Sequence, residues 1–164
     1  MTAIEIFRNN HRTIRKALVA LDRALLMQTG PWEIVTRNLA AFLDLQLREY
    51  WGAEERMIFQ PLGATGSDAA RVVEQMLQDH RDLESHLAKL KALTCSGPAA
   101  PPPLIQEHGT ALVKLFLHHM FLEEEVGFVL AEERLGLRHL EESAARVLLL
   151  KEAENGLEEP AAID

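Results

Sequence analysis

Apolar residues recur at steps of three and four over four long stretches of this chain. The stretches run from Ile4 to Leu25, from Leu39 to about Phe59, from Val73 to Leu90 and from Ile105 to Leu130. Such steps place side chains on one face of an α-helix. The sequence therefore predicts four amphipathic helices, each with one buried face.

Turn-forming residues separate these stretches. Gly30 and Pro31 predict the end of the first helix and the start of the second. Residues 61–67 (PLGATGS) predict a loop, and residues 95–103 (CSGPAAPPP) cannot be helical in their middle, so we expect a surface connection there. Long helices with short connections predict an all-α fold, an up-down-up-down antiparallel four-helix bundle.

Gly136 interrupts the fourth helical pattern. A shorter fifth helix is expected from Leu137 to about Lys151, either as a cover on one side of the bundle or as an oligomer contact. A chain of 164 residues suits one core. We therefore predict a single domain over residues 1–154, including the C-terminal helix, and a flexible tail over 155–164.

Composition excludes several kinds of function. The formal net charge of −8 argues against a nucleic-acid partner. No apolar run reaches the roughly 18 residues of a membrane helix, and charged residues among the first fifteen leave no signal-peptide core, so a cytoplasmic location is expected. Because Cys95 is the only cysteine, any metal must be held by nitrogen and oxygen ligands.

Polar residues interrupt the apolar faces. His119 and Glu123 stand one turn apart in the otherwise apolar segment 115–128, and His11 and His80 replace apolar residues in the first and third helices. Burying an unpaired polar or charged group costs several kcal/mol. These side chains therefore need partners, which could be a metal ion or hydrogen-bonding side chains.

The fixed rise of a helix, about 1.5 Å per residue, predicts which of these groups meet. His11 lies 19 residues before Gly30 and Tyr50 lies 20 residues after it, so the two reach a similar depth in an antiparallel hairpin. His80 and His119 match in depth in the same way across the connection at residues 95–103, which joins the third and fourth helices. A layer of so many buried polar groups favours a cation, and bundle di-iron and di-manganese sites use such ligands. The predicted metal ligands are His11, Tyr50, Glu54, His80, His119 and Glu123.

The order of these residues resembles the hemerythrin-like, or HHE cation-binding, family. That pattern has a histidine in the first and third helices and HxxxE in the second and fourth. The matching segments are 11–15 (HRTIR), 50–62 (YWGAEERMIFQPL), 80–83 (HRDL) and 119–128 (HMFLEEEVGF), so the resemblance covers about residues 1–135. It implies a bundle holding two iron ions, a non-heme di-iron centre bridged by Glu54, Glu123 and one solvent- or oxygen-derived group.

Tyr50 departs from the family pattern, which has a histidine at this position in the second helix. Its phenolate either binds iron directly or only packs and hydrogen-bonds. An anionic oxygen ligand favours Fe(III), which lowers the expectation of reversible dioxygen carriage. One turn after His80, where oxygen-carrying hemerythrins have a histidine, this chain has Glu84, either a further ligand or a solvated partner of Lys91 or Arg81.

The leading hypothesis for function is a di-iron protein that reacts with peroxide, a catalase-like oxidoreductase that decomposes hydrogen peroxide. The alternative is a sensor or reversible binder of dioxygen, nitric oxide or iron without turnover. The expected partner is thus a small diatomic or peroxide ligand, with neither nucleic acid nor membrane. The physiological substrate and the oligomeric state stay open.

Overall fold

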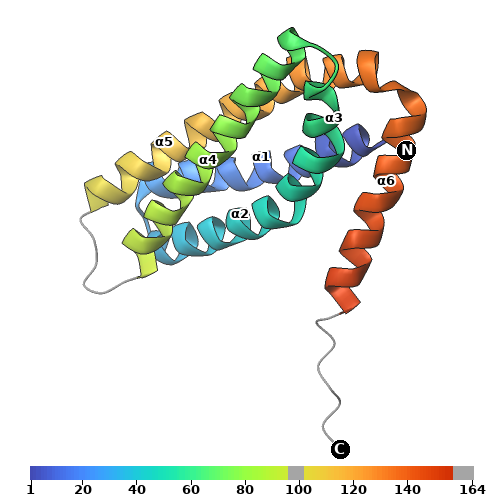
Figure 1. Ribbon diagram of the computed structural model, residues 1–164. Coiled ribbons are helices and arrows are strands. Elements are labelled where there is room, and N and C mark those ends of the chain that lie inside the picture. Colours follow the sequence, from blue (N-terminus) through green and yellow to red (C-terminus); the bar gives the residue numbers. More distant parts are fainter. Residues whose placement is uncertain (96–101, 157–164) are drawn as a thin grey trace, which may run out of the picture.

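The structure is a computed structural model that describes residues 1–95 and 102–156. Four long helices lie side by side (Figure 1): α1 (Ala3–Met27), α2 (Trp32–Glu54), α4 (Ser67–Cys95) and α5 (Pro102–Leu122). Helix α1 contacts α2 and α5, and α4 also contacts α2 and α5, so the four form a closed ring around one core. The predicted all-α helical bundle is confirmed.

Local sequence explains the ends of α1. The side chain of Thr2 accepts a hydrogen bond from the backbone N–H of Glu5, and the Glu5 carboxylate accepts one from the backbone N–H of Thr2. This capping box satisfies backbone donors that the first helical turn leaves free. Gln28 ends the helix in the left-handed region, with φ of 46°, and Gly30 follows with φ of 57°.

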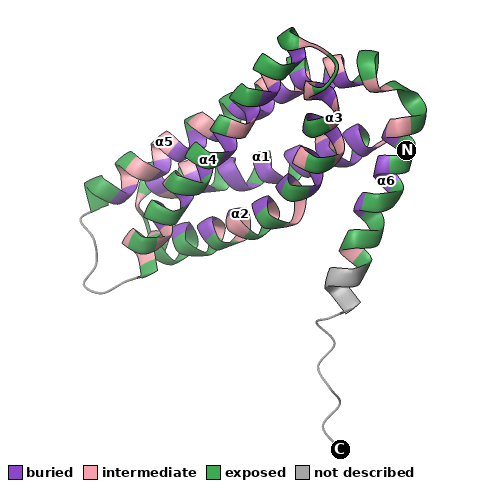
Figure 2. Ribbon diagram, viewed as in Figure 1, coloured by how far each residue is buried: buried purple, intermediate pink, exposed green. Residues whose placement is uncertain are grey.

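The buried residues of the four helices face the interior of the bundle (Figure 2). The apolar ones among them form two clusters, and a layer of buried polar residues lies between the two. One cluster lies in the half of the bundle that contains Ile14 to Leu25 of α1. The other includes Ile4 and Phe7 of α1, Val73 and Met76 in the first part of α4, and Phe59 and Phe128 in the segments after α2 and α5. His11 lies between these two parts of α1, so the position of the polar layer is set by where the apolar pattern is interrupted.

A π-helical turn begins directly after Glu54, and another begins at Glu123, the two predicted bridging glutamates. These turns are η1 (Glu55–Phe59), after α2, and η2 (Glu123–Gly127), after α5. Because a π turn holds more residues than an α turn, it moves the buried face by one position. The periodicity of apolar residues predicts that Met57 and Val126 lie in the buried faces, and this prediction is wrong. Met57 is only half-buried and Val126 is 36% exposed, whereas the following residues, Ile58 and Gly127, are buried.

The expected loop over residues 61–67 is wrong in its first half. Helix α3 (Gln60–Gly63) continues the chain after η1, and only residues 64–66 form a turn. Pro61 lies in the first turn of α3. In the 95–103 segment, residues 96–101 lie outside the described residues, and those on either side are helical.

Helix α6 (Phe128–Gly156) changes direction at Gly136, which has φ of 77° and ψ of 156°. Its second half packs through Leu140, Ala144 and Val147 and passes the N-terminus of the chain (Figure 1). The helix extends to Gly156, five residues past the expected end at Lys151, and most of the predicted tail lies outside the described residues. In the described part of the chain, no helix has the length and apolarity needed to cross a membrane.

Candidate metal centre

Five predicted ligands meet in the polar layer, each from a different turn of the bundle. They are His11 of α1, Glu54 at the end of α2, His80 of α4, His119 of α5 and Glu123, the first residue of η2. None of these residues is more than 5% exposed. The structure therefore brings together the side chains that the depth comparison placed at one level.

Glu123 lies at the centre of this layer. Its Oε1 is 3.2 Å from Nε2 of His119 and 3.6 Å from Nε2 of His80. Its Oε2 is 3.2 Å from Nε2 of His11. The layer thus contains two groups that could each hold a metal ion, His80–His119–Glu123 and His11–Glu54–Glu123. Because Glu123 belongs to both and directs one oxygen to each, it has the position of a bridging carboxylate.

The ligand atoms lack the partners that buried polar atoms need. Both oxygens of Glu123, Oε1 of Glu54 and Nε2 of His80 and His119 are buried without a hydrogen bond. Some of these atoms approach each other to ion-pair distance, but not in hydrogen-bond geometry. Each unsatisfied buried group costs about 1–3 kcal/mol. A cation between the nitrogens and oxygens would satisfy all of them, so these residues fit a metal centre.

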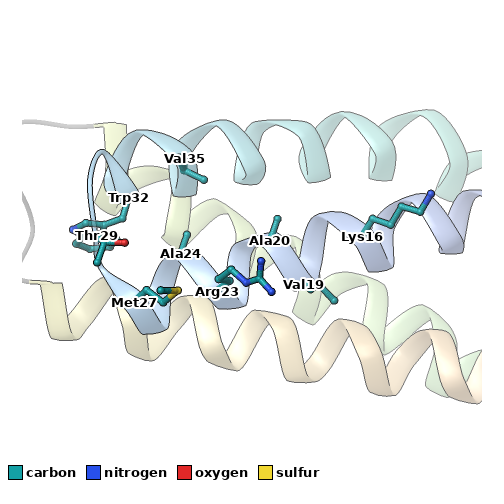
Figure 3. A pocket seen from close by; sticks show the side chains of 9 residues that line it. All are labelled: Lys16, Val19, Ala20, Arg23, Ala24, Met27, Thr29, Trp32 and Val35. Atoms are coloured by element: carbon teal, nitrogen blue, oxygen red, sulfur yellow. The ribbon is translucent and has the colours of Figure 1, made fainter.

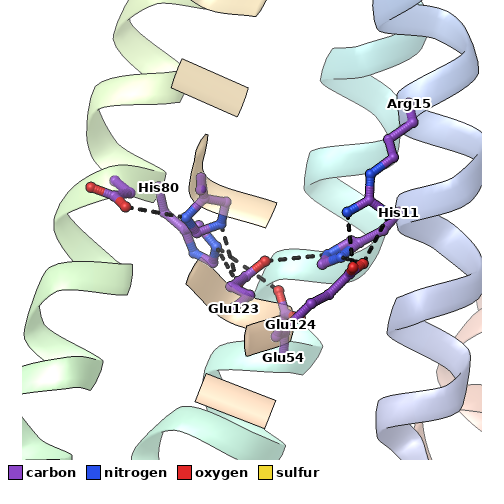
Figure 4. Close-up of polar contacts among 8 residues, drawn as sticks. His11, Arg15, Glu54, His80, Glu123 and Glu124 are labelled. Carbon is purple, nitrogen blue, oxygen red and sulfur yellow. Dashed lines mark hydrogen bonds and ion pairs between the residues drawn. The ribbon is translucent and has the colours of Figure 1, made fainter. Parts of the chain in front are cut away.

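Each histidine has its other ring nitrogen held by a carboxylate, and Figure 4 shows the pair of His11 and Glu124. With Nδ1 donating outward, Nε2 directs its lone pair toward the centre of the layer, as in metal-binding histidines. Glu124 is itself fixed by Arg15, which donates hydrogen bonds of 3.0 and 2.8 Å to its two oxygens. The Nδ1–carboxylate pairs are His11–Glu124 (2.9 Å), His80–Glu55 (2.7 Å) and His119–Asp79 (3.4 Å).

Sequence reasoning missed these three carboxylates. Glu55 and Glu124 directly follow the predicted bridging glutamates, so an α-helical period places them beside the buried face. The π turns that begin here bring both residues close enough to reach a histidine of a neighbouring helix. Asp79 directly precedes His80 and is buried. A buried acid next to a candidate ligand is the one signal that could have identified it.

Burial and neighbouring charges shift the pKa values in the layer. Burial, followed by repulsion from Glu123, raises the pKa of Glu54 to about 8. Burial lowers the pKa of His11, but the neighbouring carboxylates of Glu123 and Glu124 outweigh it and raise that pKa to about 9. In His119 burial is outweighed by the charge of Glu123 and the bond with Asp79, so the pKa rises to about 10. At neutral pH the metal-free layer therefore holds protons that a cation would displace.

Tyr50 lies at the edge of the layer, one turn before Glu54. It is half-buried and lines a cavity of about 10 Å³ together with Asn10, His11 and Glu54. That volume is close to the minimum for one water molecule. The side-chain nitrogen of Lys151, from α6, lies 3.8 Å from the centre of the Tyr50 ring. Tyr50 thus borders the His11–Glu54–Glu123 group, and its direct binding of a metal stays a prediction.

Aromatic rings enclose the histidines. Trp51 stacks on His80 with ring centres 4.1 Å apart and an angle of 7° between the planes. Phe128 stacks on His11 at 5.7 Å, and Phe59 lies 5.8 Å from His80. All three aromatic side chains are buried. They limit the access of water to the layer, which strengthens its electrostatic interactions.

Glu84 has no place in the site. It is exposed on α4, outside both groups of candidate ligands. The basic residues considered as its partners have others, because Lys91 donates to Asp44 at 2.6 Å and Arg81 donates to Gln78 at 2.7 Å. Its exposure agrees with the helical pattern, which places Glu84 beside the buried face of the third helix and not in it.

A surface groove of about 360 Å³ lies along α1 and the start of α2 (Figure 3). Its lining combines apolar side chains such as Val19 and Met27 with the basic residues Lys16 and Arg23. None of its lining residues is histidine, cysteine or an acid. The groove is therefore separate from the candidate metal centre.

The fold and the buried layer define a metal-binding helical bundle, and a comparison of sequences names its family. The family model described as the hemerythrin HHE cation binding domain matches residues 2–131, and this chain belongs to that family. The matched region contains all six predicted ligands. Searches among curated proteins and among solved structures found no match. Membership implies binding of metal cations, typically iron, which agrees with the two His/Glu groups.

Proposed function

We propose that the chain holds two iron ions in its polar layer. The observation that carries this proposal is the shared carboxylate, since Glu123 contributes to two separate three-residue groups. Histidine and carboxylate ligands from facing helices are the donors that bundle di-iron sites use. A single zinc ion with four ligands would leave several buried donors without a partner.

The proposed division of the ligands between the two ions follows the two His/Glu groups. His80 and His119 would hold one ion, and His11 with Tyr50 would hold the other. Glu123 would bridge them, and Glu54 would bridge them on a second side. Support for the second bridge comes from the place of Glu54 in the group with His11 and from its Oε2, 3.9 Å from Nε2 of His80.

The proposed reaction is the conversion of two hydrogen peroxide molecules to two waters and one dioxygen. Bound iron supplies the electron transfer that this reaction needs. The cavity beside His11 and Tyr50 has room for only about one water-sized molecule, which supports a small ligand such as peroxide over a larger substrate. The bidentate pair of Arg15 and Glu124 fixes the His11 ring at the wall of this cavity. A phenolate from Tyr50 would stabilise the ferric state.

The same cavity supports a second candidate function. A volume of about 10 Å³ also suits a diatomic ligand, so reversible binding of dioxygen or nitric oxide is the alternative. Tyr50 favours peroxide chemistry over dioxygen carriage, because carriage needs an easily reached ferrous state. Binding without turnover would give a ligand-dependent spectrum and no product.

Oxygen evolution from added hydrogen peroxide tests the proposal. The iron-loaded protein should produce dioxygen well above an equal concentration of free iron, and Glu123→Ala should lose both the iron and the activity. Glu125→Ala is the matched control, because Glu125 is exposed and belongs to neither candidate metal group. Turnover no faster than that of free iron, in protein with its full iron content, would exclude catalysis. The cytoplasmic location stays a prediction.

A further inference from the structure

The two halves of the bundle repeat each other residue by residue. His11 corresponds to His80, Glu54 to Glu123, and Phe59 to Phe128. In every pair the residue numbers differ by 69 (80 − 11). The first pair lies on α1 and α4, and the others lie around the two π turns, so corresponding residues occupy corresponding elements.

The interactions repeat as well as the residues. Glu124 accepts from His11 at 2.9 Å, and its counterpart Glu55 accepts from His80 at 2.7 Å. Phe128 lies 5.7 Å from His11, and its counterpart Phe59 lies 5.8 Å from His80. A contact seen in one half therefore indicates which residues face each other in the other half.

One pair of positions differs in both members. In the second half, His119 donates from Nδ1 to Asp79 at 3.4 Å. The corresponding residues of the first half are Tyr50 and Asn10. In the first half, tyrosine thus takes the place of the histidine, and asparagine takes the place of the aspartate. The two exchanges fit each other chemically. An imidazole N–H needs an acceptor, which Asp79 supplies. A phenolate oxygen needs a donor and would be repelled by a carboxylate.

The surroundings of Asn10 agree with such a role. Asn10 is 7% exposed, its Oδ1 is buried without a hydrogen bond, and it lines the same small cavity as Tyr50. The amide can present either its oxygen or its NH₂ group, because the two exchange places when the side chain rotates. A buried amide with a free atom at this place is otherwise unexplained.

We propose that Asn10 is a positioning residue for Tyr50, donating a hydrogen bond from its side-chain amide to the phenolate oxygen. The inference rests on the proposed binding of iron by Tyr50. It explains why this position carries a neutral amide where its counterpart carries an acid. Asn10 would orient the phenolate and lower the energy of its negative charge, without itself contacting the metal.

The visible spectrum of the iron-loaded protein is the first test. Wild-type protein should show a phenolate-to-iron charge-transfer band that Tyr50→Phe abolishes. Asn10→Ala should move this band to lower energy, because the phenolate loses a hydrogen bond that stabilises its electrons. Asn9→Asp is the matched control, since Asn9 is exposed and its side-chain oxygen accepts from Arg12 at 2.9 Å. That variant should leave the band unchanged.

The rate of iron loss to a strong chelator is the second test. In the wild-type background, Asn10→Asp should speed iron loss by about tenfold, the lower end of the effect of changing a ligand's hydrogen-bond partner. In the Tyr50→His background the same substitution should slow iron loss, because it restores the acid–imidazole pair found at Asp79 and His119. A general packing role for Asn10 predicts the same direction in both backgrounds.

The outcomes separate this inference from the proposed function. Wild-type protein that holds iron without a phenolate band would overturn iron binding by Tyr50 and this inference with it. A wild-type band that Asn10→Ala leaves unmoved would overturn the role of Asn10 alone, and so would an effect of Asn10→Asp with one sign in both backgrounds. If Asn10→Asp fails to fold by circular dichroism, the spectrum of Asn10→Ala still decides, because that variant adds no charge.

Discussion

Glu124→Gln should weaken iron binding although Glu124 is not one of the proposed ligands. The carboxylate of Glu124 accepts one hydrogen bond from Nδ1 of His11 and two from Arg15, at 2.9, 3.0 and 2.8 Å. Oε1 accepts from both Nδ1 of His11 and Arg15, and Oε2 accepts from Arg15 alone. In either orientation, the NH₂ group of a glutamine would therefore face a donor of Arg15, and the contact that holds this side chain against His11 would be weakened. The His11 ring would lose its fixed orientation.

The expected size of this effect follows from the position of the pair. Changing the hydrogen-bond partner of a metal-binding histidine lowers metal affinity by roughly 10–100-fold. The Glu124 side chain is 22% exposed, so water can partly replace the lost bonds, and the lower end of that range applies. We therefore expect about a tenfold loss, equivalent to about 1.4 kcal/mol. Only the ion held by His11 should be affected.

The assay is a competition for iron between the protein and a chelator of known affinity. Glu124→Gln should release one iron per chain at about tenfold lower chelator concentration, and the second iron should follow the wild-type curve. Glu125→Gln is the control, because it makes the same chemical change at an exposed neighbouring position. Two curves identical to wild type would refute the claim that Glu124 fixes a metal ligand.

Two further predictions concern stability and pH. Gly109→Ala should lower the free energy of unfolding by about 1–3 kcal/mol in urea denaturation, because the added Cβ would lie 2.5 Å from Cδ1 of the fully buried Leu25. The metal-free protein should lose stability as pH rises from 7 to 10. The pKa values of His11 and His119 are raised to about 9 and 10 in the folded protein. The two histidines therefore contribute fully to the free energy of unfolding below about pH 6.5, and this contribution is lost as the pH rises through 9 and 10. A metal-free protein that is more stable at pH 10 than at pH 7 would contradict these pKa shifts. Metal binding at pH 7 should release protons, which an indicator dye can measure.

The bundle and most of the metal layer could be predicted because both follow from regular helix geometry. A period of 3.6 residues identifies the buried faces, and a constant rise per residue brings His11, His80 and His119 to one level. These arguments need no detail of the side chains. They apply as long as the chain stays α-helical.

The same arguments fail where the helices are not regular. The π turns that begin at Glu55 and Glu123 move the buried face by one residue, so Ile58 and Gly127 replace Met57 and Val126 in the interior. They also account for Glu55 and Glu124 reaching histidines of other helices. Nothing in the local sequence distinguishes a π turn from an α turn, because its cause lies in the contacts of the whole layer.

The direction of α6 after Gly136 could not be predicted from the sequence either. A glycine signals a break, but the angle of the break depends on how Leu140 and Ala144 pack against the rest of the bundle. As a result, the cation of Lys151 over the Tyr50 ring could not be foreseen. The contact gives the C-terminal helix a link to the candidate metal centre.

The iron content of the protein at saturation tests the central claim most directly. Elemental analysis after iron loading and removal of loose metal should give two irons per chain for wild-type protein. Glu123→Ala, which removes the carboxylate shared by both groups, should retain fewer than one. A wild-type value of one iron per chain, or a Glu123→Ala variant that keeps two, would contradict a pair of iron ions bridged by this residue.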